Sequence, residues 1–123
     1  MRLKSEIWVK AFIRRCAVEG AAAVVVRHGD DDAGAIFIKV SRLDGSCKVF
    51  GPAPAGLDDT ATDRRWTPRL GGGDRTDIDA ETFLVREAEF DPDIWVVELE
   101  DRAGRHFLDD WLQADCRAEV LRQ

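Results

Sequence analysis

The spacing of apolar residues along the chain predicts two helices. Between residues 5 and 19, apolar side chains recur at intervals of three and four, which places them on one face of a helix. Ser5 is the expected N-cap of this helix. A strand over residues 6–13 is the alternative, because several residues there favour strands. The second helix is expected from its N-cap at Asp79 to Phe90, since a proline two residues later prevents its continuation.

Runs of β-branched residues bounded by glycine, proline and aspartate predict strands elsewhere. The Asp44-Gly45 pair is a hairpin signal, so the first three strands are expected to form an antiparallel meander. Pro68 cannot donate to a ladder, which restricts its strand to an edge or an end of the sheet. A turn at Gly104 is expected to return the chain in a terminal hairpin. The expected strands are residues 21–27, 35–43, 47–50, 63–70, 94–100 and 105–108.

These elements predict an α+β fold. We expect an antiparallel sheet of about five or six strands, made of a meander plus a terminal hairpin, with the helices packed on one face. A chain of 123 residues is expected to form a single domain. Residues 51–62 and 71–77 lack periodicity and are rich in glycine, typical of mobile loops. A C-terminal helix is expected over about residues 110–122, because Leu112, Cys116 and Val120 recur at helical spacing.

Composition and charge limit the partners of this protein. With 45% hydrophobic and 34% charged residues, the chain has the composition of a soluble globular protein. A net charge of −6 argues against nucleic acid as a partner, because affinity for phosphates comes largely from basic side chains. No segment approaches the ~20 consecutive apolar residues of a spanning helix, so no membrane partner is expected.

The three cysteines indicate a reducing compartment. Cys16, Cys47 and Cys116 are isolated and odd in number, and they lack the paired spacing of metal or redox motifs. We therefore expect free thiols in a cytoplasmic protein. The chain also lacks a phosphate-binding glycine loop and a nucleophile elbow, so no catalytic residue, metal or cofactor is predicted.

Three sequence blocks together resemble a small, uncharacterised bacterial family of domains of unknown function. The blocks are RLKSEIWV at residues 2–9, DRRWTP at 63–68 and REAEFDPDIWVVELEDRAGRHFLD at 86–109, of which the last is the most specific. The resemblance spans most of residues 2–109 and leaves out the tail after Asp110. It implies a cytoplasmic bacterial protein, and it carries over neither an activity nor a catalytic residue.

A group of carboxylates with one histidine is the candidate site for acid/base chemistry. Glu87, Asp91 and Asp93 cluster after the second helix, and Glu100 and His106 follow the next strand. Paired carboxylates act as general acid and base, and carboxylates with imidazole also bind divalent cations. The structural alternative is that the two aspartates accept backbone N–H groups and fix the turn that ends the helix.

A basic and aromatic cluster is the candidate binding site. Arg64, Arg65, Trp66 and Arg69 form the densest such group in the chain and lie between two glycine-containing segments. Arginine and tryptophan together stack on bases or hold anionic partners. The structural alternative is an edge strand whose arginines oppose aggregation and whose tryptophan packs inward.

Taken together, these patterns favour a non-enzymatic interaction or accessory domain that binds a protein partner or forms a homodimer. Its expected contacts are a sheet edge and the segment from Arg64 to Trp66. One alternative is a small hydrolase that uses the clustered carboxylates, with or without a divalent cation. A third is a nucleic-acid binder that uses the arginine and tryptophan cluster.

Overall fold

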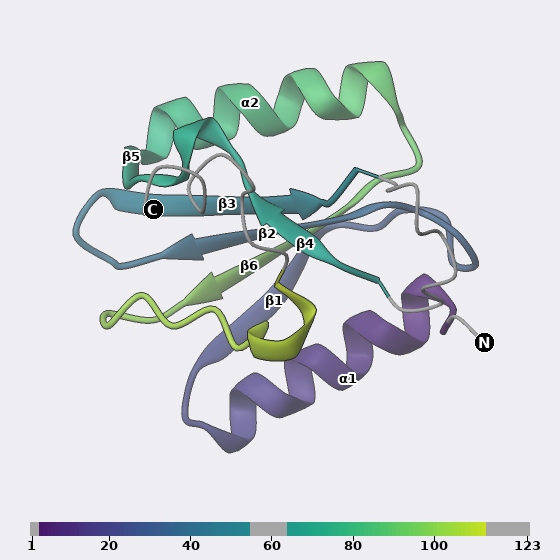
Figure 1. The fold of residues 1–123 in the computed structure, drawn as a ribbon, viewed down its shortest axis with the longest axis horizontal. Helices are drawn as coiled ribbons and strands as arrows, with labels where there is room; N and C mark the ends of the chain where they lie inside the picture. The colour runs from purple at the N-terminus through teal and green to yellow at the C-terminus, as the bar shows by residue number, and fades with distance from the viewer. Residues whose placement is uncertain (1–2, 55–63, 113–123) are drawn as a thin grey trace, which may run out of the picture.

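The computed structural model of the protein describes residues 3–54 and 64–112 and shows a sheet between two helices (Figure 1). The six-stranded, mostly antiparallel open sheet confirms the α+β class. The helices are α1 (Ser5–Val18) and α2 (Asp77–Phe90). The strands are β1 (Ala22–Arg27), β2 (Ile36–Ser41), β3 (Ser46–Pro52), β4 (Trp66–Pro68), β5 (Arg75–Thr76) and β6 (Trp95–Glu100), with short 3-10 turns η1 (Leu70–Gly72) and η2 (Asp109–Trp111).

The order of the strands differs from the predicted meander. The sheet runs β1-β6-β2-β3-β4, with β5 paired to β3, so β6 lies between the first two strands of the chain. It pairs antiparallel with β1 and parallel with β2. The meander is therefore β2-β3-β4. The physical reason is that β6 is largely buried on both faces, as a central strand is; Trp95, Val97 and Leu99 are buried on one face and Val96 on the other.

The predicted terminal hairpin is wrong, because residues 105–108 form no strand. Both edges of β6 already pair with β1 and β2, which leaves no ladder for a returning strand. The segment turns instead. The Asp101 carboxylate accepts the backbone N–H of Arg105 at 2.8 Å, and Phe107 has a φ of 54°. Phe107 and Leu108 then enter the core beside α1.

The two helices cover opposite faces of the sheet, not one face as predicted. Helix α1 packs with Ile36, Ile38 and Val40 of β2, whereas α2 packs with Phe37 of the same strand. Figure 1 shows the sheet lying between them. Because β2 and β6 present apolar side chains in both directions, each face requires its own cover.

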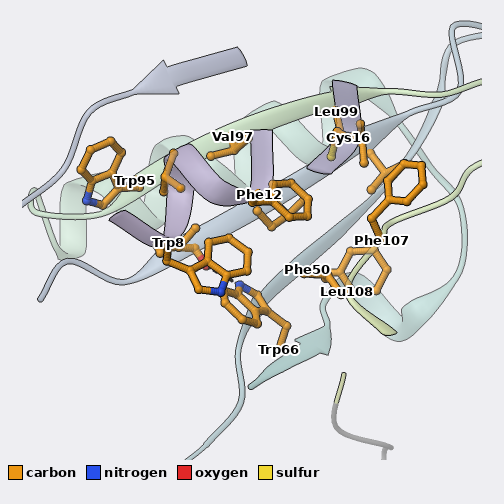
Figure 2. Packing of buried hydrophobic residues seen from close by; sticks show 14 of the residues in the cluster. Trp8, Phe12, Cys16, Phe50, Trp66, Trp95, Val97, Leu99, Phe107 and Leu108 are labelled. Atoms are coloured by element: carbon orange, nitrogen blue, oxygen red, sulfur yellow. Dashed lines mark hydrogen bonds between the residues drawn. The ribbon is translucent and has the colours of Figure 1, made fainter. Parts of the chain in front are cut away.

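The core under α1 is built around aromatic rings. Trp8 lies 4.2 Å from Trp66 and 5.0 Å from Phe12, measured between ring centroids (Figure 2). The indole N–H of Trp66 donates to the backbone carbonyl of Ile36 at 2.9 Å, which satisfies its polar group inside the core. These contacts fix α1 against the sheet and β4 against β2.

The helix starts also differ in detail from the predictions. Lys4, not Ser5, occupies the N-cap of α1, and Ser5 is fully buried. The hydroxyl of Thr76, not the side chain of Asp79, caps α2 by accepting the Asp79 N–H at 3.1 Å. A hydroxyl three residues before a backbone donor has the ordinary capping geometry.

Most of the predicted C-terminal helix, residues 110–122, lies outside the described residues. The same is true of much of the loop predicted at 51–62, of which the first residues extend β3 to Pro52. The loop predicted at 71–77 contains the short strand β5, which pairs with β3. Its pairing is local and involves only two residues, too short a run to show in the sequence pattern.

Candidate functional site

The segment from Arg64 to Trp66 is built into the fold. Trp66 is 1% exposed, so its ring has no free face on which a base would stack. Arg64 is also buried, and its guanidinium donates to the Leu3 carbonyl at 3.1 Å and to the Ser5 hydroxyl at 2.8 Å. Arg64 therefore connects the start of α1 to the segment that leads into β4.

The other two arginines of this cluster also serve the sheet. The backbone carbonyl of half-buried Arg65 accepts the Ala53 N–H at 2.9 Å. Arg69 donates from its guanidinium to the Pro52 carbonyl and lies 6.0 Å from the ring centroid of Phe37. Trp66 thus packs inward, as the structural alternative anticipates. The three arginines instead make contacts that join β4 and its flanks to β3 and to the start of α1.

The candidate acid/base residues lie at two ends of β6. Asp91 accepts the backbone N–H of Asp93 at 3.0 Å, the turn-fixing contact of the structural alternative, and Glu87 is half-buried on α2. Glu100 is the last residue of this six-residue strand, which spans about 16 Å, and His106 lies beyond it. The structure therefore does not bring these five side chains together.

His106 lies in a groove of about 320 Å³ between the end of α1 and residues 105–109. Its Nδ1 accepts the Leu108 N–H at 3.0 Å, which leaves the proton of the neutral ring on Nε2. Burial lowers the pKa of His106, so the ring is neutral at pH 7. The groove is lined by Arg15, Glu19, Arg105, His106, Phe107 and Asp109.

The arginines of this groove already have carboxylate partners. Arg15 pairs with Asp109 at 3.0 Å, and Arg105 pairs with Asp101 at 2.8 Å. The hydrogen bonds from Arg105 lower the pKa of the Asp101 carboxyl and raise that of the guanidinium. The groove is therefore close to charge balance and does not select strongly for an anion or a cation.

Lys39 is an ionisable residue whose burial among carboxylates is not predicted from the sequence. It lies on β2 under α2 and is 2% exposed. Its Nζ is 2.5 Å from Asp77, 2.6 Å from Glu81 and 3.3 Å from Glu98. Burial alone lowers the pKa of Lys39, but hydrogen bonds to the first two carboxylates and the charge of the third reverse the effect, and the pKa is raised. The available signal was a lysine in the apolar run IFIKV.

The outer edge of β1 is apolar and open to solvent. Val24, Val25 and Val26 are 54%, 39% and 57% exposed. Among the described residues, no strand pairs with β1 on the side away from β6. The register shifts between Val25 and Arg27, so Val26 forms a bulge. Arg27 is the only charged residue of the strand.

The thiols and acidic groups give no further centre within residues 3–54 and 64–112. Cys16 and Cys47 are buried and free, and burial raises the pKa of both thiols, that of Cys16 to about 11. In this part of the chain, no three His, Cys, Asp or Glu side chains lie close enough to hold a metal ion. No helix in the same residues has the length and apolar character needed to cross a membrane.

Comparison with known proteins identifies similar chains. Residues 3–109 match the family model described as a protein of unknown function, DUF1491. A search of curated proteins finds no significant match.

Solved structures of related proteins have the same fold. A crystal structure of a DUF1491 family protein from Caulobacter crescentus is 40% identical, covers 93% of this chain and 100% of its own, and has a TM-score of 0.74. The solution structure of protein Atu0922 from A. tumefaciens is 41% identical over 81% of this chain and 86% of its own, with a TM-score of 0.71.

Proposed function

Since the chain belongs to DUF1491, a family described as proteins of unknown function, we propose a function from its own geometry: a protein-interaction domain that associates through β1. The observation that supports this proposal is the exposure of three consecutive valines on an edge strand. Exposed apolar edges offer unpaired N–H and C=O groups to another strand, and native proteins usually protect them.

The two edges of the sheet differ in this respect. Strand β4 has three residues, ends in Pro68 and makes a bridge from Trp66 to Leu112, features that blunt an edge. Strand β1 has six residues and no proline. Its protective features are the bulge at Val26 and the single charge of Arg27 at its end. A second strand therefore has more backbone to pair with on β1.

The partner we propose for β1 is a second copy of the same chain. Two β1 strands placed antiparallel about a two-fold axis bring valines opposite small apolar residues. The single charge, Arg27, stands at the end of the strand, so such pairing does not place like charges directly opposite each other. The free, buried thiols of Cys16 and Cys47 support a cytoplasmic setting for this association.

Sedimentation at increasing protein concentration tests the proposal. We expect dimers in the unmodified chain and monomers in Val24→Lys, because a lysine on an exposed edge opposes strand addition. Val18→Lys is the matched control, since Val18 is 80% exposed on α1 and away from the edge. A chain that stays monomeric at all concentrations, or a dimer that survives Val24→Lys, would count against self-association.

A hydrolase is the second candidate, and one observation favours it. His106 lines a groove, and because its Nδ1 already accepts the Leu108 N–H, the Nε2–H of the neutral ring is the group left to donate to a bound substrate. The carboxylates of Glu87, Asp91 and Asp93 do not contribute to this groove. A panel of chromogenic ester and phosphoester substrates tests the idea: turnover that disappears in His106→Gln would support it, and no turnover would oppose it.

A further inference from the structure

The negative charge of the protein is concentrated in one stretch. Residues 77–93, which comprise α2 and the turn after it, contain seven carboxylates and one basic residue, Arg86. Their net charge of −6 equals that of the whole chain, so the remaining residues are neutral overall. A surface that carries the entire net charge produces a local negative potential strong enough to select partners.

Exposed apolar side chains lie within the same stretch. Phe90 is 93% exposed, the highest value among the large apolar residues of the described chain. Ile78 and Val85 are 76% and 55% exposed. The inward face of α2 packs against the sheet through Ala80 and Leu84. The three exposed residues therefore belong to its outer side and its end, where they do not stabilise this fold.

The carboxylates of α2 are not neutralised by the fold. Lys39 is one ammonium group for the carboxylates of Asp77, Glu81 and Glu98, so this group retains a net negative charge. Asp77 and Glu81 are 59% and 49% exposed in spite of these contacts. Next to Phe90, Glu89 and the acidic residues of the turn are exposed as well.

This combination of charge and exposed apolar groups restricts the class of partner. Phosphate backbones and anionic membranes are repelled by a face of this charge, and a second copy of α2 is repelled for the same reason. A basic protein surface is attracted, and apolar side chains on it desolvate Phe90, which is the setting in which aromatic residues contribute most to binding.

We propose that the outer side and the C-terminal end of α2, with Ile78, Val85 and Phe90 among the carboxylates, bind a basic protein surface that carries exposed apolar side chains. This site is separate from the β1 edge, because the inward face of α2 packs with Phe37 of β2, Val49 of β3 and Val96 of β6, whereas β1 lies at the edge of the sheet beyond β6. Binding of a partner to α2 and dimerisation through β1 are therefore separate events, and an experiment can disprove either one without affecting the other.

Fluorescence anisotropy with two labelled peptides tests this proposal. One is a helical peptide with lysines on one face and leucines on the opposite face. The other has the same charge, with serine in place of each leucine. We expect saturable binding of the first peptide, weakened by added salt, and affinity reduced about tenfold for the serine peptide.

Variants of the protein locate the site. Phe90→Ser is expected to reduce affinity for the leucine peptide about tenfold, whereas Val18→Ser, which removes an 80% exposed apolar residue from α1, leaves it unchanged. Glu89→Lys is expected to reduce affinity through charge alone. The proposal would be overturned if the leucine peptide did not bind, or if Phe90→Ser and Val18→Ser bound it with equal affinity. It would also be overturned if the protein bound duplex DNA or anionic vesicles more tightly than the leucine peptide.

Discussion

The ammonium group of Lys39 donates a 2.6 Å hydrogen bond to the carboxylate of Glu81 and thereby joins the middle of β2 to α2. Helix α2 needs this contact because its buried side chains are few, chiefly Ala80 and Leu84. Burial of one leucine contributes only about 1.5–3 kcal/mol. The ionic group around Lys39 is therefore a principal attachment of α2 to the sheet.

Replacing Lys39 with methionine is expected to destabilise the fold by about 2–4 kcal/mol. The methionine fills the space of the lysine stem, but it leaves three carboxylates facing one another without a cation. The measurement is the free energy of unfolding from urea titration at pH 7. Lys10→Met is the control, because Lys10 is exposed and forms a surface ion pair with Glu6; it is expected to change stability by less than about 0.5 kcal/mol. Equal effects of the two variants would contradict the prediction.

The pH dependence of the Lys39 contribution follows from the sign of its shift. The folded-state pKa is raised above the ordinary value of 10.5, so the stabilisation is fully present below that value and is lost as pH rises through the folded pKa. We therefore expect the stability difference between the unmodified chain and Lys39→Met to be constant from pH 7 to 9 and to shrink only in strong alkali. A difference that falls near neutral pH would show that Lys39 is not charged in the fold.

His106 gives a pH dependence of the opposite direction. Its folded-state pKa is lowered from 6.5 by burial, so the neutral ring is favoured in the fold. The stabilisation is present above 6.5 and is lost as pH falls through that value toward the folded pKa, because the unfolded chain takes up the proton first. Urea titrations between pH 7.5 and about 5 are expected to show a smaller decrease in stability for His106→Gln than for the unmodified chain. A ring that titrates at or above 6.5 by NMR would refute the assignment.

Local patterns predict both described helices and most of the strands of this fold. The periodicity before Gly20 specified α1, and the Asp44-Gly45 pair specified the turn between β2 and β3. Both depend on neighbouring residues alone. The predicted placement of the strand with Pro68 at a sheet edge is confirmed, since β4 lies at the end of the sheet. Such features are encoded within a few residues, so they do not depend on the order of the strands in the sheet.

Contacts between residues far apart in the chain could not be predicted from the sequence. The pattern of β6 indicates a buried strand but not its neighbours, so its place between β1 and β2 was missed. The role of Lys39 depends on carboxylates 38, 42 and 59 positions away along the chain. Likewise, the cluster of Arg64 and Trp66 has the composition of a binding site, and only the packing of Trp66 on Trp8 shows that it is internal.

Trp66→Phe tests how strongly this internal tryptophan holds β4. The substitution keeps an aromatic ring against Trp8 but removes the N–H that donates to the carbonyl of Ile36. A buried carbonyl without its donor costs about 1–3 kcal/mol, so we expect a destabilisation of that size. Trp111→Phe is the control, because Trp111 is half-buried at the margin of the same cluster. Equal stability of the two variants would show that the hydrogen bond contributes little.

Close backbone approach at Gly34 leads to a final prediction. A Cβ atom at this position would lie 2.4 Å from the backbone oxygen of Asp93, and that oxygen also accepts the Asp30 N–H at 2.9 Å. Because backbone on both sides must move to make room, Gly34→Ala is expected to destabilise the fold by about 2–3 kcal/mol. Gly73→Ala is the matched control, since no atom lies within 4 Å of its added Cβ and its φ of −93° suits any residue. Thermal unfolding monitored by circular dichroism compares the stability of the two variants. If Gly34→Ala were as stable as Gly73→Ala, the backbone of the loop before β2 would be able to move without loss of stability.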